Sequence, residues 1–388
     1  MLALIGVGGL AIDISNHYVT KTLIQNALDS AALAGAKVLN LTDDQTQATA
    51  AALEVFNMHL SGKLSDSGIV PTIEYSNILN PFTPGGADPD YIRASVSDFD
   101  LSFFIARILP GVGDTQRVIG SAVAGPIPLS VEPGTEICDV APILLCGEPG
   151  DTNCGDGSCF GYDLSTDGTP NFHELKTGAE PGDDWEVGPG NFQLLSLSCG
   201  TGANCVRSGL AGGEDDLCVE VGATTQTEPG NTVGPVAQGF NTRFGQYQGG
   251  QINSVDHPPD TKTQFSPNFD PLNGDTDNSG YWYSDYVAEG PNFSPSPVGV
   301  PGRRILTVPV GRCDGTENGR GDVEIYGAAC MFMLKPVTQA GNTQWIHGQI
   351  IPDGCDAQGS ASSTPVPPGD GSGPYKIVLY KNSDSIGT

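Results

Sequence analysis

The sequence predicts an α+β protein in which a long N-terminal helix lies on an antiparallel sheet and is followed by a disulfide-rich, mostly-β C-terminal domain. Three observations support this fold class. A helical pattern opens the chain, glycine (53) and proline (30) together exceed a fifth of the 388 residues, and none of the ten cysteines precedes Cys138. Frequent glycine and proline beside short apolar runs are typical of short strands joined by turns. We therefore divide the chain into an N-terminal helix (1–40), an α+β domain (41–130) and a Cys-rich, β-rich domain (131–388).

The first twelve residues carry no charged side chain, and residues 2–12 contain only Leu, Ala, Ile, Val and Gly. A helix of this length spans about 18 Å, which is short of the roughly 30 Å of a bilayer core. The basic region and cleavage site of a signal peptide are not visible. We expect an apolar projection whose glycines let neighbouring helices approach closely; a frayed terminus is the alternative. The residues expected in this helix packing are Leu2, Leu4, Ile5, Gly6, Gly8, Gly9, Leu10, Ile12 and Asp13.

After Asp13 the apolar residues recur at spacings of three and four, and this helical period predicts one face that packs on a domain. The helix is expected to continue to about Val38. A capping box at Thr42-Asp43-Asp44-Gln45 predicts a second helix over 43–60. The packed face is expected to contain Val19, Leu23, Ala27, Ala31 and Ala34, with Leu28 and Ala32 beside them. Strand-like runs follow at 68–78, 90–109 and 115–126.

The cysteines indicate an oxidising compartment, because their number is even and they cluster in a Gly/Pro-rich region. A zinc site is the competing interpretation, since four residues separate Cys154 from Cys159. No second such pair with nearby histidines supports zinc, so we predict disulfides of unassigned pairing. Residues 235–300 and 356–374 are expected to be loops. The disulfide candidates are Cys138, Cys146, Cys154, Cys159, Cys199, Cys205, Cys218, Cys313, Cys330 and Cys355.

The net charge is −28, with 17 Lys and Arg against 45 Asp and Glu. A field of this sign repels phosphate backbones and disfavours docking on anionic lipid, so we expect no nucleic-acid partner. The simplest interpretation is an acidic surface exposed to solvent. The more specific alternative is an acidic surface that binds divalent cations.

The N-terminal run GLAIDISNHYVTKTLIQNALDSAALAGAKVL resembles the N-terminal helix of the tight-adherence (Tad) pilus-assembly family, the TadE/TadG-like pseudopilins. Motifs in the C-terminal half are similar to that family as well, among them Pro-Gly-Asn-Phe at 189–192 and Val-Pro-Val at 308–310, so that the resemblance extends over most of the chain. The N-terminal residues that fit the family pattern are Asp13, Tyr18, Gln25, Asn26, Ala27, Asp29, Ala31, Ala32, Leu33, Ala34, Gly35 and Ala36.

Two features depart from the pattern. The family has a longer apolar run with a prepilin-type leader, and type IV pilins carry Glu at mature position five, where this chain has Ile5. We expect either a processed, mature chain or a segment that differs from standard pilins.

The resemblance implies a secreted, pilin-like structural subunit of a type IV or tight-adherence-like extracellular filament, self-assembling through its N-terminal helix. The implied partners are copies of itself in a helical homopolymer, other pilins or the assembly machinery, and the inner membrane before assembly. The implied location is an extracellular or cell-surface filament, reached by export through the bacterial inner membrane. The alternatives are a minor, membrane-held assembly component and a soluble surface adhesin or carbohydrate-binding protein. In the adhesin or carbohydrate-binding alternative, the binding loop would contain Tyr281, Trp282 and Tyr283.

The one cofactor that the sequence suggests is calcium. In the run Asp-Thr-Asp-Asn-Ser-Gly, Asp275, Asp277 and Ser279 occupy the first, third and fifth positions of a calcium loop. The twelfth position is Tyr286 instead of Glu, and an ordinary Asx-rich turn is the alternative. The candidate replacements for that Glu are Asp285 and Glu289. The motifs His-Glu-x-x-His, Gly-x-Ser-x-Gly and the P-loop are missing from the sequence, so we predict that the protein is not an enzyme.

Overall fold

The structure is a computed structural model of the chain, and its contacts divide the chain into two compact units. The first comprises Met1–Pro126 with Ile377–Thr388, and the second comprises Ile127–Lys376. The C-terminal end therefore returns to the N-terminal unit, which the division at 130/131 did not anticipate. Side chains are described from Gly9 onward, except at Glu174. The residues described are 2–60, 64, 67–108, 113–151, 158–164, 173–175, 187, 191–200, 202–212, 217–267, 269, 280–288, 299–315, 317–337, 345–352, 354–361 and 373–381.

The first unit is built on α1 (Leu2–Thr42), a continuous helix that extends beyond the predicted end at Val38. A second helix, α2 (Gln45–Leu60), packs against it. The two helices approach closely at Gly35, where a Cβ would stand 3.1 Å from that of Ala52. Alanine and glycine at this crossing let the helix backbones come together with few large side chains between them.

The start of α2 differs from the predicted capping box. Asp44, and not Thr42, caps the helix, because its carboxylate accepts hydrogen bonds from the backbone N–H groups of Thr46 (2.7 Å) and Gln47 (3.2 Å). Thr42 still belongs to α1, and its hydroxyl donates to the Val38 carbonyl. The predicted second helix is confirmed, with its start shifted by this choice of cap.

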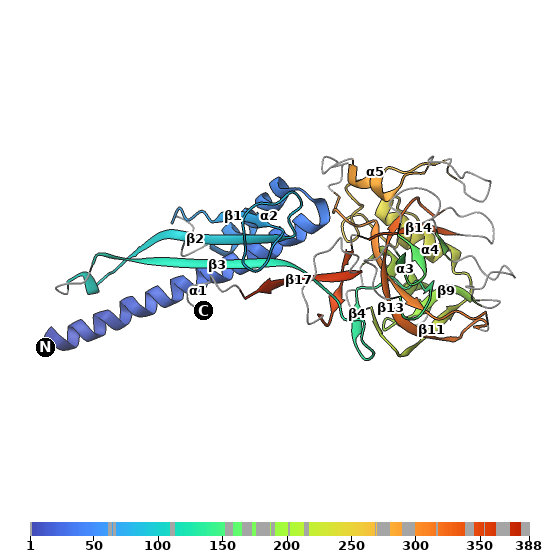
Figure 1. Cartoon of the computed structure of the whole chain (residues 1–388), viewed down its shortest axis with the longest axis horizontal. Coiled ribbons are helices and arrows are strands. Elements are labelled where there is room, and N and C mark those ends of the chain that lie inside the picture. Colours follow the sequence, from blue (N-terminus) through green and yellow to red (C-terminus); the bar gives the residue numbers. More distant parts are fainter. Residues whose placement is uncertain are drawn as a thin grey trace. The chain divides into compact units, whose positions relative to one another are not determined.

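All three predicted strands are present and form an antiparallel sheet in the order β1 (Thr72–Ser76), β2 (Tyr91–Ser102) and β3 (Thr115–Pro128). The sheet runs alongside α1 (Figure 1). At Gly120 of β3 a Cβ would stand 3.0 Å from the Leu28 side chain, so the helix lies close on the strand. The core between them is apolar, and its large members include Ile24, Leu28, Phe56, Leu60, Ile92, Val96 and Val118.

The buried face of α1 is rotated from the one predicted. Ala27 and Ala31, with Leu28 and Ala32 beside them, are buried as expected. Val19, in contrast, is exposed, and Ala34 is half-buried. Small alanines occur on several sides of this helix, so the spacing alone could not identify the face that the sheet covers. The buried positions from the middle of the helix onward are Ile24, Ala27, Leu28, Ala31, Ala32, Gly35, Ala36 and Leu39.

The second unit is mostly β, as predicted. Its largest sheet has the order β5-β12-β13-β11-β9, with β14 and β8 joined beside β13, and a smaller sheet has the order β10-β4-β16. Helices interrupt the segment 235–300 that was expected to be loop. β17 (Pro374–Tyr380) is divided between the units, because its residues from Ile377 onward belong to the first, where the strand follows β3 in the sheet order. The other elements of the second unit are β4 (Glu136–Cys138), β5 (Leu145–Cys146), β6 (Ser158–Cys159), β7 (Tyr162–Asp163), β8 (His173–Leu175), β9 (Asn191–Ser196), α3 (Ala203–Ala211), β10 (Cys218–Glu220), β11 (Thr224–Pro229), α4 (Val233–Phe240), η3 (Asn241–Phe244), α5 (Tyr283–Ala288), β12 (Ile305–Gly311), β13 (Asp322–Met333), β14 (Ile346–Ile350), β15 (Cys355–Asp356) and β16 (Gln358–Gly359).

The expected disulfides are present in the second unit. Cys159 is also disulfide-bonded, and Cys154 lies outside the described residues. No described cysteine is free, so the described thiols offer no zinc ligand. The pairs whose two members are described are Cys138–Cys218, Cys146–Cys313, Cys199–Cys205 and Cys330–Cys355.

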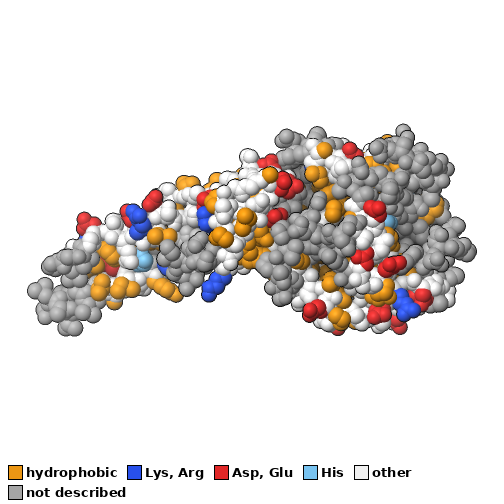
Figure 2. All heavy atoms as spheres, viewed as in Figure 1, with side chains coloured by type: hydrophobic (Ala, Val, Ile, Leu, Met, Phe, Trp, Pro, Cys, Tyr) orange, Lys and Arg blue, Asp and Glu red, His pale blue; other side chains and the backbone are white. Residues whose placement is uncertain are grey.

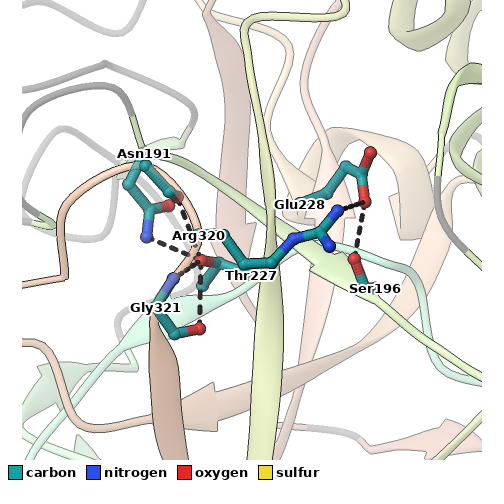
Figure 3. A network of polar contacts seen from close by, with 7 residues as sticks. Asn191, Ser196, Thr227, Glu228, Arg320 and Gly321 are labelled. Carbon is teal, nitrogen blue, oxygen red and sulfur yellow. Dashed lines mark hydrogen bonds and ion pairs between the residues drawn. The ribbon is translucent and has the colours of Figure 1, made fainter.

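Polar contacts join strands at one end of the large sheet (Figure 3). The Thr227 hydroxyl of β11 accepts from Asn191 Nδ2 at 3.0 Å and from the Gly321 N–H at 2.9 Å. Nearby, Ser196 donates to the buried Glu228 carboxylate at 2.5 Å. Side chains from β9 and β11 are thus tied to each other, and β11 is tied to the start of β13.

A buried arginine lies where β12 begins. Arg304 is 0% exposed, and its guanidinium donates to the carbonyls of Met333 (2.7 Å) and Gln264 (2.7 Å). The guanidinium also stands 4.5 Å from the centroid of the Phe332 ring, and its backbone N–H donates to Asp260 at 2.8 Å. Several carbonyls and an aromatic ring therefore replace the water that this cation loses on burial.

Replacing Arg304 with Lys should destabilise the second unit. An ammonium cannot reproduce the planar fork, so carbonyls now paired would be left buried without donors. We expect the free energy of unfolding to fall by about 3 kcal/mol, measured by chemical denaturation with the disulfides intact. Arg312→Lys is the matched control and should change stability by less than about 0.5 kcal/mol, because that side chain is 60% exposed. Equal effects of the two substitutions would contradict this account of Arg304.

Candidate functional site

The N-terminal half of α1 has one face closed by its own chain. Gly9 is buried against Ile105, and a Cβ at Gly9 would overlap that side chain. Ile105 lies in the connection between β2 and β3, next to the short 3₁₀ helix η1 (Ala106–Ile108). The close approach that this glycine permits is thus made within the chain.

Asp13 fixes the same connection to α1. Its carboxylate accepts three backbone hydrogen bonds, from Phe104 (2.8 Å), Ile105 (2.9 Å) and Ala106 (2.5 Å). These N–H groups lie at the start of η1, where helical donors have no partner within the helix. A carboxylate at such a position satisfies them in the manner of an N-cap, although here the acid comes from another element.

The electrostatics of Asp13 follow from these contacts. Removal from water would raise the pKa of this carboxyl, but the three backbone hydrogen bonds and the nearby positive charge of Arg107 outweigh that effect and lower the pKa. Asp13 is therefore ionised at neutral pH, which is the state that accepts all three bonds.

The opposite side of this half-helix is apolar and open. Leu10, Ile14 and Tyr18 follow one another at spacings of four, so they form a row along the helix. Ile14 is 57% exposed and Tyr18 is 71% exposed. Ile12 and Val19 are exposed as well, but they lie on another side of the helix, because residues two apart do not share a face. We call the exposed surface formed by both sides the outer face of α1, and its large hydrophobic residues are Leu10, Ile12, Ile14, Tyr18 and Val19.

A shallow hollow of about 460 Å³ lies on this outer face. Figure 2 shows hydrophobic side chains at the surface along this part of the chain. Isolated exposed hydrophobic residues are common, but five within ten helical residues form a patch of the kind that marks interaction sites. The hollow is lined by Ala11, Ile12, Ser15, Asn16 and Val19.

The residues expected in helix packing thus separate into three groups. Leu10 and Ile12 are exposed on the outer face, whereas Gly9 and Asp13 are occupied by the β2–β3 connection. Leu2, Leu4, Ile5, Gly6 and Gly8 belong to α1 by their backbone, and their side chains lie outside the description.

Sequence reasoning missed Ile14, and it named Tyr18 for its fit to the family pattern without predicting its exposure. Val19 was assigned to the packed side of the helix, but it is exposed. The available signal was the spacing of four that joins Leu10, Ile14 and Tyr18. The contact of Ile105 with Gly9 left no comparable signal in the sequence.

The calcium prediction stays untested, because Asp275, Asp277 and Ser279 lie outside the described residues. The carboxylate of Asp285 accepts the Trp282 backbone N–H at 2.9 Å, which is a helix-capping contact at the start of α5. Among the described residues no three His, Cys, Asp or Glu side chains come together as a metal-binding group.

The aromatic loop proposed for carbohydrate binding is wrong as an exposed platform. Trp282 is 2% exposed, and Tyr283 is also buried. Both belong to an apolar cluster with Phe269 and Phe332 of the second unit. Their rings pack in the core, so they present no face on which a sugar could stack.

Replacing Asp13 with Asn should loosen the β2–β3 connection, because a neutral amide accepts fewer and weaker hydrogen bonds than a carboxylate. We expect hydrogen exchange at the Phe104, Ile105 and Ala106 amides to accelerate about tenfold or more. The wild-type protein should show the same acceleration in acid, once exchange rates are corrected for pH. The folded pKa is lowered, so this contribution is present above about pH 4 and is lost as the pH falls through the folded value. Thr22→Asn, an exposed change on the same helix, is the control; unchanged protection in Asp13→Asn would contradict the assignment.

Comparison with known proteins bears on this helix. No helix among the described residues has the length and apolar character needed to cross a membrane. No curated protein and no solved structure matches the chain. The family model described as putative Flp pilus-assembly TadE/G-like matches residues 1–38, which span the closed and outer faces of α1. The chain therefore carries a TadE/G-like segment of the Flp pilus-assembly (Tad) family at its N-terminus.

Proposed function

We propose that the chain is a pilin-like structural subunit of a tight-adherence-type extracellular filament, and that it assembles through the outer face of α1. The observation that carries this proposal is the exposed apolar row within a helix that matches a pilus-assembly family. The role is structural and needs no catalysis.

Burial energetics support self-association of this face. Fully burying a Leu or Ile side chain contributes about 1.5–3 kcal/mol, so several partly exposed ones together favour packing against another apolar helix. The expected occupant is the α1 helix of another copy, or that of another pilin. Because Asp13 and Gly9 hold the β2–β3 connection on the other side, packing is expected at the outer face.

A minor, membrane-held assembly component is the second candidate, because the description of the matching family refers to pilus assembly and does not specify a filament subunit. The two roles differ in stoichiometry. Electron microscopy and subunit quantification of sheared surface material separate them. Filaments composed mainly of this chain support the structural role, and filaments that contain only traces of it support the minor one.

The outer face can be tested without cutting the helix. Removing residues 1–14 would also remove Asp13, so point substitutions isolate the apolar face more cleanly. The double variant Ile12→Asn with Ile14→Asn should raise the concentration needed for filament formation at least about tenfold, because two apolar contacts per subunit become polar. Sedimentation of filaments from purified full-length chain measures this concentration.

Val255→Asn is the matched control, because Val255 is an exposed apolar residue of the second unit. It should leave assembly unchanged. Circular dichroism should show that the double variant retains its helix content. Normal filament formation by a folded double variant would show that the outer face is not the assembly surface.

A further inference from the structure

Two guanidinium groups meet at the C-terminal end of α3 in the second unit. Arg243, which is 5% exposed, donates through Nε to the Leu210 carbonyl at 2.8 Å and through Nη1 to the Arg303 carbonyl. Arg303 is half-buried and donates through Nε to Pro258 at 3.0 Å and through Nη2 to Ala211 at 2.6 Å. The two side chains therefore share the last carbonyls of one helix.

Among the described residues, neither guanidinium has a carboxylate partner. Both carboxylate oxygens of Asp260, the acid whose charge acts on both arginines, already accept from the Tyr286 hydroxyl. Burial, and then the charge of Arg303, lowers the pKa of Arg243. The charge of Asp260 thus acts on both arginines without a direct hydrogen bond to either, and it only partly offsets the cost of burying them.

One nitrogen of each arginine that makes no hydrogen bond to a described residue lies close to Gly212. Arg303 Nη1 and Arg243 Nη2 lie 2.7 Å and 3.0 Å from the position that a Cβ on Gly212 would occupy. Neither nitrogen has an acceptor among the described residues. Both nitrogens therefore pack against the same glycine and lie within about 6 Å of each other, a separation that the oxygens of a single anion can bridge. Gly212 is itself exposed, and its φ of 70° is the left-handed conformation of the residue that follows the helix.

A histidine completes the surroundings. The Nδ1 atom of His257 is buried without a hydrogen-bond partner among the described residues. Burial and the charge of Arg303 lower the pKa of His257, so its ring is neutral at pH 7. A neutral ring thus lies near the two cations, whose charges both act on it.

We propose that Arg243 and Arg303 form a binding site for an oxyanion, namely a carboxylate, sulfate or phosphate group, beside Gly212. Planar guanidinium forks match such groups, and hydrogen bonds to ionised acceptors are the strong ones. The site lies in a protein of net charge −28, so the local cationic pair and not the overall field selects the anion. The proposal concerns the second unit alone and is independent of filament assembly.

Isothermal titration calorimetry of the full-length chain with sodium sulfate, phosphate or acetate tests the site, at ionic strength held constant with sodium chloride. We expect saturable binding, with one site per chain, for at least one of these anions. The thermal unfolding midpoint of the second unit should rise with the same anion by about 3 °C or more at saturation. The absence of saturable binding for all three anions would overturn the proposal.

Two variants localise the binding. Arg303→Gln should abolish it, and Arg303→Lys should weaken it at least tenfold, because an ammonium keeps the charge but loses the fork. Arg312→Gln, a change at an exposed arginine, should bind as the wild type does. If Arg303→Gln is less stable, the calorimetry is performed well below its unfolding midpoint. Equal affinity in folded Arg303→Gln and wild type would place the anion elsewhere and overturn the assignment.

Discussion

The Asp13 carboxylate makes the contact on which the interpretation of α1 depends. Three backbone donors from residues 104–106 converge on its two oxygens, and Ile105 fills the space left by Gly9. One side of the N-terminal half-helix is thereby closed within the chain. The large apolar residues elsewhere on this half-helix remain exposed. The contact made by one charged residue therefore determines which side of the N-terminal half of α1 is occupied by the chain's own β2–β3 connection.

The same residue shows the limits of sequence reasoning. The sequence led us to expect Asp13 among the residues that pack against neighbouring helices, directly after a run without charge. Its partners, however, lie more than ninety residues away, in a connection whose sequence carries no capping motif. Local patterns predict helices and strands because their causes are local. A cap supplied by a distant element depends on tertiary structure and leaves no local signal.

For the other elements too, features with local causes were predictable and features that depend on tertiary contacts were not. The helix, the three strands and the presence of disulfides were all predictable, because periodicity, β-branched runs and cysteine number record them directly. The buried face of α1 was only partly predictable, because alanine can occupy buried and exposed positions of a helix alike. The role of Gly35 depends on its contact with Ala52, which the sequence does not show. The pairing of Cys138 with Cys218 was open, because spacing does not determine connectivity.

Three arginines of the second unit are wholly or partly buried, although the chain has few cationic residues. The chain has only 17 Lys and Arg, yet Arg243 and Arg304 are buried and Arg303 is half-buried. Burying a cation is unfavourable, so each needs a compensating group. Arg304 finds carbonyls and an aromatic ring, which accounts for its position at the start of β12. Arg243 and Arg303 have carbonyls for part of their donors, while Arg243 Nη2 and Arg303 Nη1 pack against Gly212 and have no acceptor among the described residues. That contrast between satisfied and unsatisfied donors distinguishes a structural arginine from a pair suited to bind an anion.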